Sequence, residues 1–431
     1  MREPEKRQRP KGQFRVSTKT GFLLVTLAWT AGCLLGALPY YCSGVLPRFA
    51  DAVFESVSGF TTTGATVIAG VEALGRPILF WRGFTQWIGG MGIVVLSAAL
   101  FPLLGVGGVH ALRAESPGPG NDKIAPKITA AARMLWFLYL ALTLAETVLL
   151  AAFGMDWFDA LIHSFSTIST GGFSGRNRGI AAYDSPSIEW VCILFMFFAG
   201  FNFSLLCRFL QGKHREIRDN SEARAYGGLI AVSTLICLVL LLPGLSFGRG
   251  LRQSLFHTLS ILTTTGFSVT DHTLWPPAAQ ACLFFLMFIG GCSFSAAGGI
   301  KVIRHVVLFK QMGNELKRLL TPRGVFSIQL NRRPGKKEMV YGVAGFVFLY
   351  FVIILAAMVV LSAAGLNIIT ALNLSLLSLG NIGLGFGQSG FGPLIYHLPA
   401  WAKYGLCFLM IAGRLELWTV FVLFSREFRG Q

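Results

Sequence analysis

Leu262-Thr263-Thr264-Thr265-Gly266-Phe267-Ser268 is one of four short stretches, rich in Gly and in Thr or other small polar residues, that decide how this chain folds. Each stretch follows a short apolar segment and precedes a long one. The short segment cannot cross a bilayer as a helix, because a helix rises only about 1.5 Å per residue. The other three copies are Gly59-Phe60-Thr61-Thr62-Thr63-Gly64-Ala65-Thr66, Thr167-Ile168-Ser169-Thr170-Gly171-Gly172-Phe173 and Ser378-Leu379-Gly380-Asn381-Ile382-Gly383-Leu384-Gly385.

The composition is that of a membrane protein. The 431 residues are 53% hydrophobic and 13% charged, and their mean hydropathy is +0.61. Several apolar runs approach the roughly twenty residues that a helix needs to span a bilayer. The net charge of +17 lies mainly between these runs, which the positive-inside rule explains better than a nucleic-acid partner. The eight cysteines stand singly and predict small buried residues, with neither a metal site nor a disulfide framework.

The order of long span, half-length helix, Thr/Gly turn and long span occurs four times. This order predicts an all-α polytopic membrane protein in which four pseudo-repeats of helix, pore helix, filter loop and helix surround a central pore, as in potassium channels. The second long segments of repeats 2 and 4 are predicted as single spans over about 189–210 and 401–424. The expected divisions are an N-terminal arm over 1–20, repeat 1 over 21–109, a linker over 110–130, repeat 2 over 131–212, repeat 3 over 213–310, a basic linker over 311–338 and repeat 4 over 339–431.

Charge predicts the orientation of these repeats. The segment 301–337 holds ten Lys and Arg against one acidic residue, Glu315, whereas the segment 42–76 holds only Arg48 and Arg76 against three acidic residues. By the positive-inside rule, the arm, the linkers and both termini are cytoplasmic, and all four turns enter from outside. Eight full spans are expected. The first apolar run has no small-residue cleavage site after it and is expected to be a retained span.

Irregular Gly-rich backbone at membrane depth is tolerated where it lines a cavity or is buried in protein. A single such turn is more often an ordinary loop, but four copies in the same context predict a pore. Rings of backbone carbonyls can replace the hydration shell of a large monovalent cation, and the C-terminal ends of the half-helices also favour a cation. The predicted filter residues are Thr62, Thr63, Gly64, Ser169, Thr170, Gly171, Thr264, Thr265, Gly266, Asn381, Ile382 and Gly383.

Two features predict a gate. The last segment of repeat 3 is interrupted at 290–299, where Gly290, Gly291, Gly298 and Gly299 weaken a helix by about 1 kcal/mol each. This segment is either a loop that folds into the pore or a small-residue packing face. Arg414 lies inside the last span, where a charge usually faces a cavity or a partner. It either projects into the pore as an electrostatic barrier or forms a local pair with Glu416.

Four polar residues precede the turns within the half-helices. They are expected to pack or cap the pore helices rather than to relay protons. These residues are Glu55, His163, His257 and Asn373.

Several motifs resemble the TrkH/TrkG/KtrB superfamily of bacterial potassium transporters, with TrkH-like chains the most similar. They follow in family order from about residue 21 to the end of the chain. The matching stretches are Phe54 to Thr66, Phe80-Trp81-Arg82, Gln86-Trp87-Ile88-Gly89-Gly90-Met91-Gly92, Ala114 to Pro119, Ser169 to Ser174, Gly298-Gly299-Ile300-Lys301-Val302, Ser378 to Gly383 and Gly413-Arg414-Leu415-Glu416.

The resemblance implies a multi-pass protein of the bacterial inner membrane that carries potassium, bound at the filter residues, and has no covalently bound cofactor. It also implies a homodimer gated by a cytoplasmic TrkA/KtrA-type ring, which alone would bind nucleotide. In such proteins the 290–299 segment and Arg414 form the gate. The chain departs from TrkH-like proteins in having only a basic arm before repeat 1 and in carrying Leu384 where the fourth filter usually has proline.

Other functions remain open at this point. A less selective or sodium-preferring cation channel is the main alternative, because each filter stretch is a single turn and not a Gly-Tyr-Gly strand. An intramembrane enzyme would need a Ser/His, paired-Asp or His-x-x-x-His constellation within the spans, and the sequence has none. A receptor or scaffold would not need four filter-like turns. The linker 311–338, with Arg318, Arg323, Arg332 and Arg333, is either a docking surface for the regulator or only an orientation signal.

Overall fold

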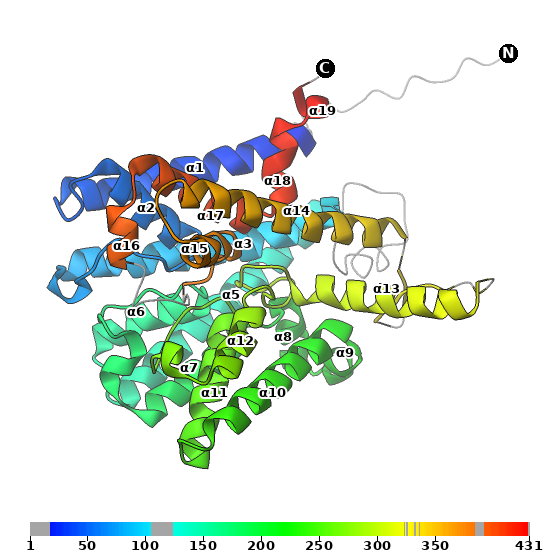
Figure 1. The fold of residues 1–431 in the computed structure, drawn as a ribbon, viewed down its shortest axis with the longest axis horizontal. Coiled ribbons are helices and arrows are strands. Elements are labelled where there is room, and N and C mark those ends of the chain that lie inside the picture. Colours follow the sequence, from blue (N-terminus) through cyan, green and yellow to red (C-terminus); the bar gives the residue numbers. More distant parts are fainter. Residues whose placement is uncertain are drawn as a thin grey trace.

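The computed structural model describes residues 18–104, 124–322, 324, 326–331, 333–335, 337–383 and 392–429. Its described part is built almost entirely of helices (Figure 1). Most of the N-terminal arm, most of the first linker, Arg323, Arg332 and Leu384 lie outside these residues. The predicted all-α polytopic class with four pseudo-repeats is confirmed.

Each repeat begins with a long helix followed by a half-length pore helix that packs against it. The long helices carry continuous apolar sequence, whereas each pore helix ends where its Thr- and Gly-rich turn begins. The four pairs are α1 (Thr18–Cys42) with α2 (Phe49–Phe60), α5 (Ile124–Ala152) with α6 (Trp157–Ile168), α10 (Ser221–Leu241) with α11 (Phe247–Leu262), and α14 (Lys337–Ser362) with α15 (Ile368–Gly380).

The last helices of the repeats differ from one another. In repeat 1, α3 (Arg76–Leu104) is one helix of 29 residues. Repeat 2 has α7 (Pro186–Gly200) followed by α8 (Phe203–Leu210), repeat 3 has α12 (Pro277–Leu286), an irregular segment and α13 (Val302–Leu320), and repeat 4 has α17 (Ala400–Arg414) followed by α18 (Leu417–Phe421).

The prediction of single spans over 189–210 and 401–424 is therefore wrong. The chain bends by 104° between α7 and α8 and by 115° after α17. Asn202 starts a new helix at the first bend by accepting a hydrogen bond from the Leu205 amide (3.1 Å). At the second bend Glu416 has a φ of 67°, which no residue of an α-helix adopts. Apolar segments flank both bends and together are long enough for one span, which is why the sequence predicted single helices there.

Four of the described helices are long and apolar enough to cross a membrane, and six if each bent pair is counted as one span. These four are the long helices α1, α5, α10 and α14. The count of eight full spans stays a prediction, because side chains of α3 fall partly outside the described residues and α12 has only 10 residues.

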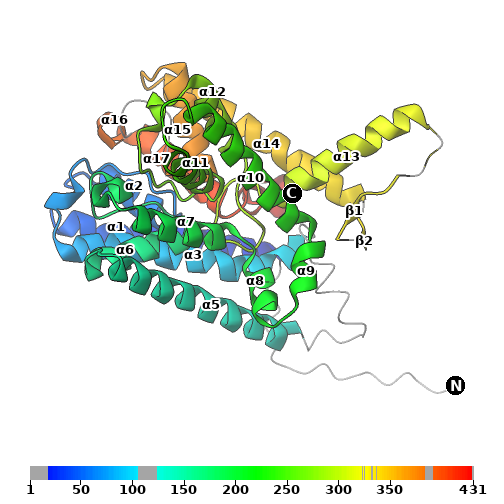
Figure 2. The same cartoon turned by 90° about the horizontal axis from the view of Figure 1, so that it is seen from below.

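The remaining elements are short connections. Helix α13 extends away from the bundle, and the small β1–β2 hairpin lies beside it (Figure 2). The connections are η1 (Val71–Ala73), η3 (Gly179–Tyr183), α9 (His214–Asp219), η4 (His272–Leu274), β1 (Gln329–Leu330), β2 (Arg333–Pro334), α16 (Gly392–His397), η5 (Val422–Phe424) and α19 (Arg426–Arg429).

Candidate functional site

All four pore helices end in the same backbone conformation. The residue that leaves each helix is left-handed: φ is 53° at Thr62, 56° at Thr170, 60° at Thr264 and 52° at Asn381. This conformation costs a non-glycine residue about 1–3 kcal/mol, and it is least favourable for a β-branched residue. Because the same unfavourable conformation recurs at four buried positions, these turns are the candidate functional site.

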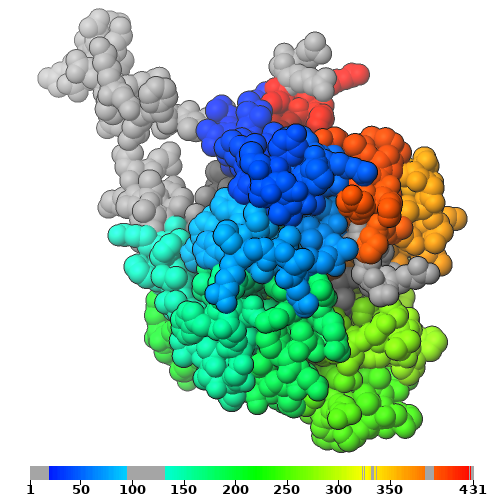
Figure 3. All heavy atoms as spheres, turned by 90° about the vertical axis from the view of Figure 1, so that its left-hand side faces the viewer, coloured from blue at the N-terminus to red at the C-terminus, as the bar shows by residue number. Residues whose placement is uncertain are grey.

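The four turns close a ring in chain order. A Cβ on Gly64 would lie 2.2 Å from the carbonyl oxygen of Gly171, and one on Gly172 would lie 2.1 Å from that of Thr265. A Cβ on Gly266 would lie 2.6 Å from the Cα of Gly383. In turn, a Cβ on Gly383 would lie 3.0 Å from the carbonyl oxygen of Thr63. Each repeat therefore touches the next through backbone atoms, and successive repeats follow one another around the molecule in Figure 3.

The ring corrects the register of the second turn. The sequence pattern pairs Gly171 with Gly64 and Gly266, but the left-handed glycines are Gly64 (φ 81°), Gly172 (φ 80°) and Gly266 (φ 84°). Gly171 instead stands one position earlier, where repeats 1 and 3 have Thr63 and Thr265. Two adjacent glycines allow either register, and only the backbone angles decide between them.

All twelve predicted filter residues lie in or beside this ring, and most are buried. Thr62, Thr63, Ser169, Thr170, Thr264, Thr265 and Asn381 are each at most 1% exposed. The Asn381 amide donates to Thr63 Oγ1 (3.0 Å) and to the Met410 carbonyl (2.9 Å), so it ties the fourth turn to the first. The fourth turn is thus tied to the first by the Asn381 side chain as well as by backbone contact.

Three polar residues of the pore helices hydrogen-bond to the chain segment that follows their own turn. Glu55 accepts from Thr66 Oγ1 (2.9 Å), His163 Nε2 bonds to Ser174 Oγ (2.9 Å), and His257 Nε2 bonds to Ser268 Oγ (3.2 Å). The separation along the chain is eleven residues in all three cases. This geometry agrees with the predicted packing role of these residues. The shared spacing adds that each one holds the chain segment after its own turn.

The fourth member of that predicted set is out of register. Asn373 is buried in α15, but the residue that stands where Glu55 stands in α2 is Leu374, when both helices are aligned on their left-handed residues. The strand that follows Gly383 lies outside the described residues. Asn373 precedes Gly383 by ten residues, whereas Glu55 precedes Gly64 and His257 precedes Gly266 by nine, so the choice of Asn373 was off by one residue.

The 290–299 segment is a loop that packs against the ring. It lies between α12 and α13, and the Gly298 amide donates to Thr264 Oγ1 (2.7 Å). A Cβ on Gly298 would lie 2.4 Å from the carbonyl oxygen of Gly380, and one on Gly290 would lie 2.0 Å from that of Gly298. The glycines therefore let the loop fold on itself and approach the third and fourth turns, which a straight packing helix could not do.

Arg414 reaches this loop from the end of α17. Its Nη1 donates to the Ala296 carbonyl (2.6 Å) and its Nη2 to the Gly89 carbonyl (3.3 Å), and the residue is 3% exposed. The expected alternative of a local Arg414–Glu416 pair does not occur, because Glu416 binds Arg304 of α13 (2.5 Å). The backbone break at Glu416 separates the two charges.

Two further contacts involve buried charged groups, one within repeat 3 and one between repeats 4 and 1. The Glu222 carboxylate at the start of α10 accepts from the Ser293 amide in the loop (2.6 Å). Lys403 of α17 forms a buried ion pair with Asp51 of α2, which connects repeats 4 and 1. The contacts of Glu222, Lys403 and Asp51 were not predicted. The signal for them was a charged residue at the end of an apolar segment, and in the sequence such a residue cannot be told from an exposed charge at the membrane interface.

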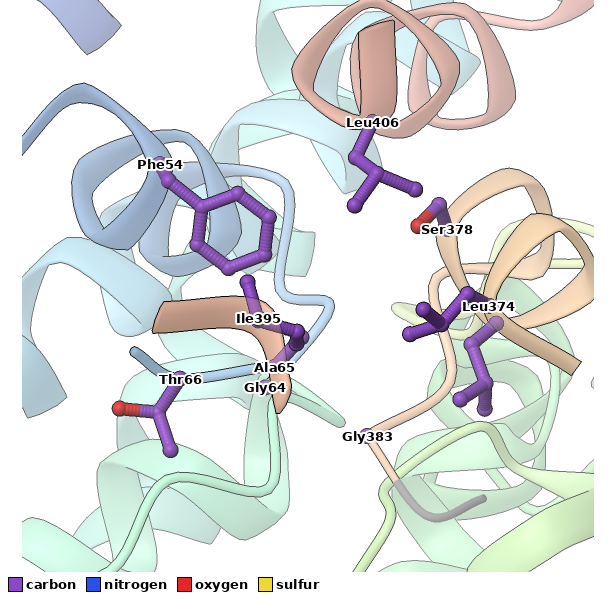
Figure 4. A pocket seen from close by; sticks show the side chains of 10 residues that line it. Phe54, Gly64, Ala65, Thr66, Leu374, Ser378, Gly383, Ile395 and Leu406 are labelled. Atoms are coloured by element: carbon purple, nitrogen blue, oxygen red, sulfur yellow. The ribbon is translucent and has the colours of Figure 1, made fainter. Parts of the chain in front are cut away.

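A cavity of about 120 Å³ lies beside the ring, between repeats 1 and 4. Figure 4 shows the side chains of Phe54, Leu374 and Leu406 around it. Its mostly apolar lining does not suit a cation. The lining residues are Phe54, Gly64, Ala65, Thr66, Leu374, Leu377, Ser378, Gly383, Ile395 and Leu406.

A helical bundle whose four half-length helices bring their Gly-rich turns into one closed ring is the architecture of a polytopic membrane transport protein. The sequence model of the TrkH family, described as "Cation transport protein", matches residues 5–248 and 244–429. The chain belongs to the TrkH family.

Individual relatives agree with this assignment. The chain is 40% identical over 422 residues to the Trk system potassium uptake protein TrkH of Halomonas elongata, covering 95% of this chain and 86% of that protein. It is 35% identical over 427 residues to TrkG of Escherichia coli K12, covering 97% and 87%. The crystal structure of the potassium transporter TrkH from Vibrio parahaemolyticus matches with a TM-score of 0.88 at 36% identity, covering 96% of this chain and 87% of that one.

Proposed function

We propose that the chain is the potassium-translocating membrane subunit of a Trk/Ktr-type uptake system. The observation that carries this proposal is the ring of four Gly-rich turns, closed in chain order by backbone contacts. The names of the relatives support potassium as the cargo. The ion would pass along backbone carbonyls of the twelve filter residues, which take the place of its water shell.

The 290–299 loop and Arg414 form the gate of this proposal. The loop packs on Thr264 and Gly380, directly against the third and fourth filter segments. Arg414 holds the loop through the Ala296 carbonyl and brings a positive charge close to the pathway. A cation would meet both a steric and an electrostatic obstacle there, and opening requires the loop to leave its present contacts.

The assembly that we propose is a homodimer in the bacterial inner membrane with both termini cytoplasmic. A TrkA/KtrA-type regulatory ring would bind on the cytoplasmic side and would carry any nucleotide. Helix α13 supports this arrangement, since it connects the gate loop to the basic linker 311–338 and extends away from the bundle (Figure 2). A regulator that moves α13 would pull on the loop.

The main alternative is a less selective or sodium-preferring cation channel. It is favoured by the single left-handed glycine in each of the first three turns, where a longer Gly-Tyr-Gly strand would offer more successive carbonyl sites. Competition of potassium and sodium against uptake of radiolabelled Rb⁺ separates the two functions. Potassium should inhibit Rb⁺ uptake at a much lower concentration than sodium does.

Growth of a bacterium that lacks its own potassium uptake systems tests the proposal directly. The chain, expressed with a regulatory subunit of the host, should restore growth at low potassium. Failure to restore growth, together with absence of Rb⁺ uptake by the purified chain in liposomes, would contradict it.

A further inference from the structure

Gln86 of α3 is a fully buried polar side chain whose hydrogen bonds go to the second turn and to the end of the pore helix α6 before it. Its Nε2 donates to the Gly171 carbonyl (2.7 Å), and its Oε1 accepts from Ser166 Oγ (2.7 Å) and from the Phe173 amide (3.2 Å). Gln86 is 0% exposed. Because buried amides keep their partners, this side chain fixes the second turn from both sides.

Packing contacts identify the residues that stand in the place of Gln86 in the other repeats. A Cβ on Gly90 or Gly200 would meet, respectively, Ser169 with the Tyr139 hydroxyl and Thr263 with the Tyr226 hydroxyl, so these two glycines are equivalent. The residue four positions before Gly200 is Met196, as Gln86 is before Gly90.

The other two repeats give the same answer. A Cβ on Gly89 or Gly413 would lie within 2.0 Å of the main-chain oxygen at the end of its own pore helix, Phe60 or Leu379. This equivalence places Met410 opposite Gln86. In repeat 3, Met287-Phe288-Ile289-Gly290-Gly291 repeats the pattern of Gln86-Trp87-Ile88-Gly89-Gly90 and places Met287 there. All three methionines are 0% exposed, so Gln86 is the one amide in a set of buried thioethers.

The filter differs at the matching point. In repeats 1 and 3 the hydroxyls of Thr61 and Thr63 (2.8 Å) and of Thr263 and Thr265 (2.7 Å) bond to each other within the turn. Repeat 2 has Gly171 where these repeats have Thr63 and Thr265, so it cannot make this bond. A Cβ on Gly171 would lie only 2.3 Å from the Cδ of Gln86. A threonine in the turn and a glutamine behind it therefore exclude each other.

We infer that Gln86 and Gly171 are an interdependent pair that positions the second filter segment and thereby contributes to ion selectivity. Gln86 is a positioning residue: from the neighbouring repeat it fixes a turn that lacks the Thr–Thr hydrogen bond of repeats 1 and 3. Glycine at 171 provides the space. This inference rests on the proposed function, because selectivity has meaning only if the ring conducts.

The test compares Gln86→Met, Gly171→Thr and the double variant in the full chain in liposomes. The readouts are the sodium concentration that halves Rb⁺ uptake and the thermal unfolding temperature. Gln280→Met is a matched control, because the half-buried Gln280 also donates two hydrogen bonds to main-chain carbonyls (2.7 and 2.8 Å) but does so at the start of α12.

We expect Gln86→Met to lower the half-inhibiting sodium concentration about tenfold, the value of roughly one lost hydrogen bond. Gly171→Thr should impair both selectivity and folding. The double variant, which installs the Thr of repeats 1 and 3 and the buried Met of the other repeats, should recover most of the selectivity of the unmodified chain. The control should leave selectivity unchanged.

Unchanged selectivity in Gln86→Met, or a double variant no better than the sum of the two single changes, would overturn the pairing. If Gln86→Met does not fold, the double variant still decides, since the pairing requires it to fold better than either single change. Absence of Rb⁺ uptake by the unmodified chain would overturn the proposed function itself and is distinguishable from both results.

Discussion

Repeats 1 and 3 carry the same Ile-Gly-Gly motif in their last helix but fold it differently. In repeat 1, Ile88-Gly89-Gly90 lies inside the 29-residue helix α3. In repeat 3, Ile289-Gly290-Gly291 follows the end of α12, and the chain becomes helical again only at Val302. A glycine pair alone therefore does not break a helix.

The difference lies in the hydrogen-bond partners that surround the two segments. In the loop of repeat 3, the amides of Cys292, Ser293 and Gly298 donate to the Gly200 carbonyl (2.9 Å), the Glu222 carboxylate (2.6 Å) and Thr264 Oγ1 (2.7 Å). Irregular backbone at membrane depth needs such replacements, because an unsatisfied group there costs several kcal/mol. In repeat 1 the glycine pair instead leaves space for two neighbouring turns: Phe60 packs against Gly89 and Ser169 packs against Gly90.

The largest expected effect tests the packing role of the first pair. A Cβ on Gly89 would lie 1.9 Å from the Phe60 carbonyl oxygen, and both groups belong to rigid backbone. Gly89→Ala should therefore destabilise the protein by about 3 kcal/mol or more, by the mechanism of overpacking. Thermal unfolding in detergent measures the change. Gly342→Ala is the matched control: no atom lies within 4 Å of the new Cβ, so it should be neutral or stabilise α14 slightly.

The second prediction tests the partners of the loop. Glu222→Ala removes the acceptor of the Ser293 amide and should destabilise the loop by about 1–3 kcal/mol. Hydrogen exchange should accelerate over residues 288–301 while the amides of α3 keep their protection. Glu222→Gln retains an acceptor oxygen and should show a smaller effect. Equal exchange in all three proteins would mean that the loop does not depend on this contact.

The third prediction concerns the charge at the loop. Arg414→Ala removes the bond to the Ala296 carbonyl together with the positive charge, so Rb⁺ flux in liposomes should rise about tenfold, consistent with the cost of a charge in the membrane. Arg414→Lys keeps the charge and should stay near the flux of the unmodified chain. An Arg414→Ala protein with unaltered rate and selectivity would remove Arg414 from the gate.

The smallest expected effect lies in the outer half of α13. Arg318 and Glu315 form an ion pair (2.9 Å) in which both side chains are more than 40% exposed. Arg318→Ala should change stability by less than about 0.5 kcal/mol and leave exchange in the 288–301 region unaltered. A measurable change in the loop would show that contacts beyond the membrane helices also set its conformation.

The fold was predictable because the lengths of the apolar segments distinguish full spans from half-length helices. Short apolar segments before the turns at Thr62, Thr170, Thr264 and Asn381 could only be half-length helices, and the structure contains all four. The position of the loop at 290–299 was also predictable, since its glycines and serines weaken a helix locally.

Other features depend on partners that the sequence does not show. The bends after Gly200 and Arg414 lie between apolar segments that together are long enough to cross a membrane. The register of the second turn, in which Gly172 and not Gly171 is left-handed, depends on backbone angles. The role of Gln86 depends on its hydrogen bond to Gly171, which lies 85 residues away along the chain. These features follow from contacts between repeats, whereas the pattern of a single repeat determines only its own helices.

The contact between Gln86 and Gly171 has one more consequence. A tetramer of identical subunits receives every mutation four times, so any change at the channel mouth must suit all quarters at once. Here the four quarters are encoded separately on one polypeptide, and a mutation alters a single quarter against three unchanged neighbours. An exchange in one quarter, such as one at Gln86 or Gly171, is therefore expected to disturb the ring less than the same exchange made in all four subunits of a symmetric channel.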